Sequence, residues 1–184
     1  TYYLSKLVTS IFFNEMVIVS TCNRTEWVFC AADEAKALDI LLQTIHLKTN
    51  VALSILKQHV RISRSREAVQ HLFQVSCGLK SMVLGENEIL AQIKLHYSMC
   101  MEFGATGSVL NKVFQSAIAT GKDVRDVTQI SKGAHSISSI AVEAIKKECS
   151  TFIDTPMLLI GAGVMIQRAI AKLVSMGHTQ LSIS

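Results

Sequence analysis

The chain has 184 residues, of which 49% are hydrophobic and 17% are charged, and its mean hydropathy is +0.36. These values exclude a disordered chain and suit a well-buried core in one full domain plus part of another. The net charge of +4 permits a nucleic-acid partner without indicating one. No apolar run approaches the roughly 20 residues of a membrane helix, and no secretion signal is recognisable, so we expect no membrane partner.

The cysteines and histidines indicate reduced thiols and no metal site. The five cysteines form no C-x-x-C pair, which argues against a zinc knuckle or a disulfide framework. The histidines show no ligand spacing, so we assign no metal ligand. We therefore expect a cytoplasmic protein.

The first part of the chain predicts two strands and a helix. Glu15–Ser20 and Glu26–Cys30 are strand-like runs on either side of a polar turn, which should be presented at one end of the pair. Asp33 should begin a helix, because the apolar residues after it follow the i, i+3, i+4, i+7 pattern. A short strand is expected near His59–Ile62.

The segment from Ser65 to Val127 reads as almost wholly helical. Three apolar stripes occur in it, and glycines mark the joints between the helices. The third stripe is the clearest; it contains Leu110, Val113, Phe114, Ala117, Ile118 and Val124. The serine-rich stretch Ser131–Ser139 should lead into one more helix, which ends near Cys149.

The pattern changes after the only proline, Pro156. Met157–Ile160 has no polar residue, as expected of a strand buried on both faces of a parallel sheet. A glycine turn and a helical pattern to Met176 follow, and Leu181–Ile183 should be the next strand. We therefore predict an α+β domain at 1–134, with a small sheet and several packed helices, and the incomplete start of an α/β Rossmann-like domain at 135–184.

The polar turn holds a possible nucleophile, Cys22. A free thiol has a pKa of about 8.5 and reacts as the thiolate, so a nucleophilic cysteine needs a nearby positive charge or base. Arg24 lies two residues on and would leave the same face of an extended backbone. Its guanidinium could lower the thiol pKa or hold a substrate carboxylate. On spacing alone, an ordinary half-buried cysteine beside a surface arginine is the favoured explanation, because free cysteines are commonly buried and inert.

Three blocks, in the same order, resemble the glutamyl-tRNA reductase family. Thr21–Glu26 (TCNRTE) resembles the signature around that family's catalytic cysteine. His71–Gln92 resembles its most recognisable stretch, in which a histidine precedes a Ser-Gly-Leu-Asp-Ser-X-Val-X-Gly-Glu-like motif. Gly121–Arg125, with the segments Ile130–Ala134 and Ser136–Ser139 that follow it, resembles a third family block.

The resemblance implies a role for each matching residue. Cys22 corresponds to the nucleophile that forms a thioester with glutamate, and His71 to a histidine needed for activity; without the motif, His71 would read as structural. The residues that correspond to the substrate pocket are Thr21, Asn23, Arg24, Ser81, Glu86, Asn87, Glu88 and Gln92. Lys80 departs from the family's aspartate, and Asn87 and Glu88 depart from its usual Pro-Gln.

The glycine turn after Ile160 is a partial dinucleotide fingerprint. The first glycine allows the tight turn, and the second lets phosphate approach the backbone at a helix N-terminus. Alone, a G-x-G is weak evidence, but the resemblance implies NADPH as the cofactor. The implied cofactor-binding residues are Gly161, Ala162, Gly163, Val164, Met165 and Ile166, the last of which replaces the third glycine.

The resemblance therefore implies NADPH-dependent reduction of glutamyl-tRNA(Glu) to glutamate-1-semialdehyde, the first step of tetrapyrrole (porphyrin) biosynthesis. It also implies a homodimer for the full-length protein and the downstream aminomutase as a possible partner. Two alternatives stay open: another thiol-dependent NAD(P) aldehyde or semialdehyde oxidoreductase, or a non-catalytic tRNA-binding or regulatory fragment.

Overall fold

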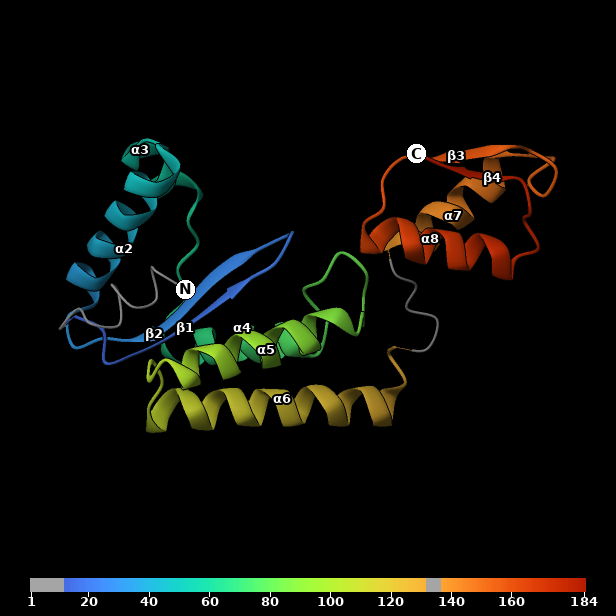
Figure 1. The fold of residues 1–184 in the computed structure, drawn as a ribbon. Helices are drawn as coiled ribbons and strands as arrows, with labels where there is room; N and C mark the ends of the chain where they lie inside the picture. The colour runs from blue at the N-terminus through green and yellow to red at the C-terminus, as the bar shows by residue number, and fades with distance from the viewer. Residues whose placement is uncertain (1–11, 132–136) are drawn as a thin grey trace. The chain divides into compact units, whose positions relative to one another are not determined.

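The structure, a computed structural model, describes residues 12–131 and 137–184 (Figure 1). These residues form two compact units. The first contains the described residues up to Ser81 together with Asn87–Gln129, and the second contains Met82–Glu86 and the residues from Ile130 onward. The predicted domain boundary at 134 falls in the segment 132–136, outside the described residues, so it stays a prediction.

The first unit is built around an antiparallel hairpin of β1 (Glu15–Ser20) and β2 (Thr25–Cys30), in which Ser20 pairs with Thr25 next to the turn. Alternation along β1 sends its apolar side chains to both faces of the hairpin. Its helices are α2 (Glu34–Thr49), α3 (Leu53–His59), α4 (Ser65–Ser76), α5 (Glu88–Glu102) and α6 (Ser108–Thr128). The predicted hairpin and the predicted helices that correspond to α2, α4, α5 and α6 are thus confirmed, whereas α3 was not predicted.

Each face of β1 belongs to a separate apolar core. Val17 and Val19 pack with residues of α4, α5 and α6, including the fully buried Phe114. Met16, on the other face, packs with Ala37 and Leu41 of α2. Figure 1 shows α4, α5 and α6 on one side of the hairpin and α2 on the other. The hairpin turn is therefore held by packing on both faces.

Helix α6 is capped by a carboxylate from β1. Its N-cap residue, Gly107, makes no side-chain cap; instead, Glu15 accepts hydrogen bonds from the amides of Val109 (3.1 Å) and Leu110 (2.6 Å). A Cβ on Gly107 would lie 2.7 Å from the Glu15 carboxylate, so only glycine leaves room for this cap. Burial tends to raise the pKa of Glu15, but these amide hydrogen bonds outweigh it and lower the pKa.

Because of this cap, we expect the first unit to lose stability at acidic pH. A carboxyl group whose pKa is lowered by folding stabilises the folded state above its unfolded pKa, and that contribution is lost as the pH falls through the folded pKa. Glu15→Gln places an amide N–H beside a donor and should cost about 2 kcal/mol at pH 7. Urea unfolding from pH 7 to pH 3 should show a flatter pH dependence for Glu15→Gln; an unchanged slope would contradict the cap.

Helices α4 and α6 approach each other closely at Gly121. A Cβ on Gly121 would lie 2.8 Å from the carbonyl oxygen of Ser76. Because this oxygen belongs to the backbone, no side-chain movement could relieve the clash. Arg125, one turn further along α6, donates from Nη1 to the same carbonyl at 2.7 Å. The guanidinium thus lies at the C-terminal end of α4, where a positive charge is favourable. This explains structurally why a glycine and an arginine occur four residues apart.

The second unit contains α7 (Ile137–Glu148), β3 (Met157–Leu159), α8 (Val164–Ser175) and β4 (Leu181–Ile183). Strands β3 and β4 pair in parallel, with α8 as the connection, as predicted for a β-α-β unit. However, Leu158 is 64% exposed, so the expected burial of β3 on both faces is wrong. The core of the second unit contains Val142, Leu159 and Leu173. Helices α7 and α8 therefore cover the face of β3 that carries Leu159, opposite the face of Leu158.

The predicted strand at His59–Ile62 is also wrong. His59 is the last residue of α3, and residues 60–64 lie in neither a helix nor a strand. The alternation of Val60 and Ile62 is genuine, but in the described residues the only strand pairs are β1–β2 and β3–β4, so this segment has no strand partner.

Within residues 12–131 and 137–184, no helix is both long enough and apolar enough to cross a membrane.

Candidate functional site

Cys22 lies in the hairpin turn, and Thr21 holds that turn together. The Thr21 hydroxyl oxygen accepts hydrogen bonds from the amides of Asn23 and Arg24, both at 3.2 Å. The Thr21 amide donates to the Arg24 carbonyl oxygen at 2.8 Å and so closes the loop. Cys22, at the tip, is an exposed free thiol. The sequence therefore folds locally so that the thiol is presented to solvent on a rigid turn.

The predicted pairing of Cys22 with Arg24 rests on an extended backbone, which the turn does not have. Residues 22 and 23 form a bend, and the Arg24 side chain turns instead towards β2. Its Nη1 donates to Glu26 Oε1 at 3.0 Å, and its Nη2 donates to the carbonyl oxygen of Lys80. The guanidinium thus lies between the hairpin and the segment after α4.

Glu26 connects Arg24 to His71. Its Oε1 accepts from Arg24, and His71 Nε2 lies 3.1 Å from the same oxygen. The side chains of Arg24 and Glu26 are about one-fifth exposed, at 19% and 20%, whereas that of His71 is 40% exposed. A carboxylate only accepts hydrogen bonds, so Nε2 must carry the proton. In the neutral ring, Nδ1 is then the nitrogen able to accept a proton.

The Glu26 cluster, defined as Arg24, Glu26 and His71, joins a strand to a helix 45 positions away in sequence. The family motif includes Glu26, but the sequence alone predicts no role for this residue. Alternation could have found it, because Glu26 lies two residues after Arg24, which immediately precedes β2, and both side chains leave the same face. Only the fold, however, shows that α4 brings His71 to that carboxylate.

The remaining predicted pocket residues lie in or after the segment that joins α4 to α5. Ser81 is half-buried, and its hydroxyl oxygen is buried without a hydrogen-bond partner in the described residues. Asn87 is exposed at the N-cap of α5, and Glu88 and Gln92 are half-buried on its first two turns. Glu86 belongs to the second unit. The roles of these five residues stay predictions.

A groove of about 1390 Å³ begins at the Glu26 cluster. It is lined by Arg24, Glu26 and His71, and by Lys80 at the segment after α4. Its walls continue along β2, α2 and residues 59–65. This volume exceeds the roughly 300–1,000 Å³ of common small-molecule pockets. The cluster is therefore open to a large or extended ligand.

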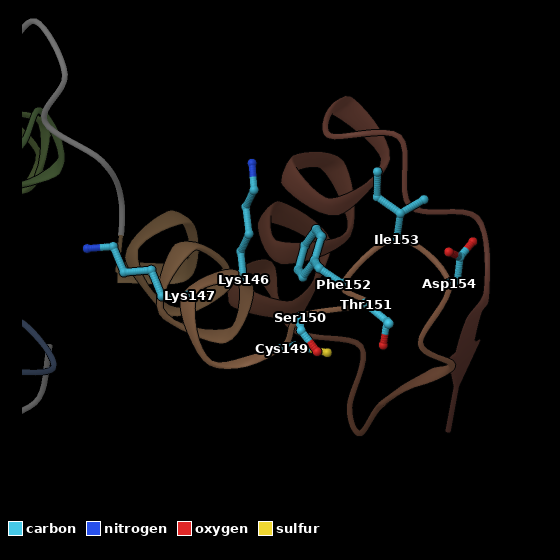
Figure 2. A pocket seen from close by; sticks show the side chains of 8 residues that line it. All are labelled: Lys146, Lys147, Cys149, Ser150, Thr151, Phe152, Ile153 and Asp154. Carbon is cyan, nitrogen blue, oxygen red and sulfur yellow. The ribbon is translucent and has the colours of Figure 1, made fainter.

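The second unit has a smaller hollow of about 410 Å³ near Cys149. Figure 2 shows that the ammonium groups of Lys146 and Lys147 point in different directions, away from the sulfur of Cys149. A hydrogen bond with Thr155, at 3.2 Å from Sγ, lowers the pKa of the Cys149 thiol. By contrast, burial raises the pKa of the Cys77 and Cys100 thiols, which pack in the interior. The hollow brings no set of reactive groups together.

The glycine turn of the second unit joins the end of β3 to the start of α8. Gly161 has a φ of +113°, which residues with a side chain rarely adopt. Gly163 is the N-cap of α8 and provides no side-chain cap, and a Cβ there would meet nothing within 4 Å. The first turn of α8 therefore has space beside Gly163, and cofactor binding by Gly161–Ile166 stays a prediction.

Known proteins similar to this chain agree on one family. Residues 2–128 match the family described as glutamyl-tRNAGlu reductase, N-terminal domain. The glutamyl-tRNA reductase of Acaryochloris marina is 38% identical over 169 residues, which cover 92% of this chain and 39% of that protein. That of Cyanophora paradoxa is 37% identical over 161 residues, covering 88% and 37%.

A solved structure supports the same relationship. The glutamyl-tRNA reductase from Methanopyrus kandleri has a TM-score of 0.65 and 32% sequence identity, over 98% of this chain and 42% of that chain. The chain thus spans about two-fifths of the length of the relatives it matches. With more than two-thirds of its residues inside the family's N-terminal domain, the chain belongs to the glutamyl-tRNA reductase family.

Proposed function

We propose that this chain carries the acyl-transfer site of a glutamyl-tRNA reductase, which forms glutamate-1-semialdehyde from glutamyl-tRNA(Glu) at the start of tetrapyrrole synthesis. The observation that carries the proposal is the exposed thiol of Cys22 on a rigid turn, within a few residues of the Glu26 cluster. Covalent catalysis at a thiol divides a difficult ester reduction into two easier steps.

In the first step, the sulfur of Cys22 attacks the carbonyl carbon of the glutamyl ester. The bond between that carbon and the ribose oxygen breaks, and the thiol proton passes to the ribose oxygen, which leaves as free tRNA. The product is a thioester between Cys22 and glutamate. His71 Nδ1 is the base that suits this proton transfer, because Glu26 holds the opposite nitrogen as N–H.

Arg24 and Ser81 supply the polar groups that suit glutamate. Arg24 is fixed by Glu26 and by the Lys80 carbonyl oxygen, so its guanidinium can face a substrate carboxylate with little loss of freedom. The buried Ser81 hydroxyl, which has no partner in the described residues, is the kind of group that a polar ligand satisfies. We propose the same pocket for Thr21, Asn23, Glu86, Asn87, Glu88 and Gln92.

The second step needs a reductant, and the glycine turn of the second unit suits one. The positive φ of Gly161, the open first turn of α8 and the parallel β3–α8–β4 order are the features of a Rossmann nucleotide site. We propose that Gly161–Ile166 contact the pyrophosphate of NADPH. When bound, NADPH would supply the hydride that converts the thioester to the aldehyde and frees the Cys22 thiol.

Charged tRNA with labelled glutamate tests this function against its two alternatives. We expect label to become attached to the chain before reduction, and semialdehyde to form when NADPH and a complete NADPH-binding domain are present. A small-acyl oxidoreductase would instead label with a simple glutamate ester and ignore the tRNA. A tRNA-binding fragment without chemistry would bind the tRNA and acquire no label.

A further inference from the structure

Lys80 is a cation of the groove that the reaction proposed above leaves without a role. Its backbone is held in place, because its carbonyl oxygen accepts a hydrogen bond from Arg24 Nη2. Its side chain is exposed and lines the groove together with Arg24, Glu26 and His71. A fixed backbone thus presents an ammonium group at the end of the groove where the Glu26 cluster lies.

The positive charge of Arg24 is already neutralised, whereas that of Lys80 is not. Arg24 Nη1 lies 3.0 Å from Glu26 Oε1, so this pair carries no net charge. Lys80 forms no salt bridge within residues 12–131 and 137–184. In the same described ranges it does not pair with Glu67, the groove carboxylate one turn before His71 on α4. The ammonium group of Lys80 is therefore available to an anionic ligand.

The acyl group of the proposed substrate carries one anion, its side-chain carboxylate. A glutaminyl ester has nearly the same shape but an uncharged amide in place of that carboxylate. An ammonium group beside the acyl group attracts the carboxylate and gains much less from the amide. Because specificity is a difference between two affinities, one cation placed there is enough to select the acidic acyl group.

We propose that Lys80 determines the specificity of the acyl-transfer site for an acidic side chain, by pairing its ammonium group with the side-chain carboxylate of the glutamyl ester. This inference rests on the proposed function, which brings the acyl group to Cys22 and the Glu26 cluster. Arg24 gives the carboxylate directed N–H donors, and Lys80 adds the net charge that Arg24, paired with Glu26, lacks.

The test compares tRNA(Glu) charged with glutamate and the same tRNA charged with glutamine. The two substrates share the RNA and the ester, so the ratio of their rates of adduct formation on Cys22 reports the side-chain charge. The parent chain should prefer glutamate, and Lys80→Gln should lower that ratio about tenfold, as for a lost hydrogen bond between charged groups. Lys80→Arg keeps the charge and should keep most of the preference. Lys80→Asp reverses the charge and should lower the ratio further.

Lys112→Gln is the matched control, because it removes the same charge from an exposed position of α6. It should leave the ratio at the parent value. Raising the salt concentration should lower the ratio for the parent and for Lys112→Gln but change it little for Lys80→Gln, since salt screens exposed charge pairs. An unchanged ratio in Lys80→Gln, or an equal loss in Lys112→Gln, would overturn the proposal.

The proposed function and this inference fail separately. Binding of the two charged tRNAs to Cys22→Ser requires no thioester, so the preference for glutamate is measurable without the reaction. A preference in that variant that disappears in Cys22→Ser/Lys80→Gln, with no adduct on the parent chain, would contradict only the reaction. An adduct on the parent chain with the same ratio in Lys80→Gln would contradict only the role of Lys80.

Discussion

Cys22→Ser is expected to abolish the covalent glutamyl adduct. A serine hydroxyl at the same exposed turn is a much weaker nucleophile than a thiolate. The ester that serine would form is also no more reactive than the substrate, which is itself an ester. The rate of adduct formation should fall to about one-thousandth of the parent value or less. The measurement is the intact mass of the chain after acid quenching of a reaction with glutamyl-tRNA.

Cys149→Ser is the matched control for that experiment. It removes another accessible thiol, lies in the second unit, and keeps a group able to hydrogen-bond Thr155. The control should acquire the adduct at the parent rate. A Cys22→Ser chain that still gains the mass of one glutamyl group would show that the nucleophile has been assigned to the wrong residue.

Glu26→Gln should slow adduct formation by about 100-fold, the low end of what general acid–base catalysis contributes. The amide keeps the size of the side chain but removes the negative charge that Arg24 and His71 share. It also no longer selects the His71 tautomer with the proton on Nε2, because an amide both donates and accepts. Glu26 is in this view a positioning residue, which acts through His71 and Arg24.

Two readouts separate positioning from a merely structural role. Affinity for uncharged tRNA should stay at the parent value while the rate at saturating charged tRNA falls, and the ¹⁵N spectrum of His71 should lose its preference for the Nε2–H tautomer. Glu67→Gln, the same change at another groove carboxylate, is the control. It should leave the rate at saturating charged tRNA and the ¹⁵N spectrum of His71 unchanged. A fall in affinity that accounts for the whole loss of rate would argue against the positioning role.

The hairpin and most helices could be predicted because their signals are local. The alternation in Glu15–Ser20 and the spacing of Leu110, Phe114 and Ala117 depend only on residues near in sequence, and the structure buries the expected side chains. Asp33 was a local signal too, and it caps α2 by accepting from the Lys36 amide at 3.1 Å.

The site was harder to predict because its contacts are not local. Glu26 meets His71 only after α4 has packed, and Glu15 caps α6 from 95 positions away in sequence. The pairing of Cys22 with Arg24 was inferred from an extended backbone, whereas the hydroxyl of Thr21 holds a turn there. Val60 and Ile62 alternate like a strand, but alternation does not supply a neighbouring strand.

The Glu15 cap has a consequence for the order of folding during synthesis. Glu15, at the start of β1, leaves the ribosome 95 positions before Leu110, whose amide donates the hydrogen bond that the Glu15 carboxylate accepts. At about 5–20 residues per second, β1 waits roughly 5–19 s for that partner. A two-stranded hairpin alone is at best marginally stable, so the nascent chain exposes its apolar strands throughout this interval. We therefore expect folding of the first unit to be completed only after α6 has emerged.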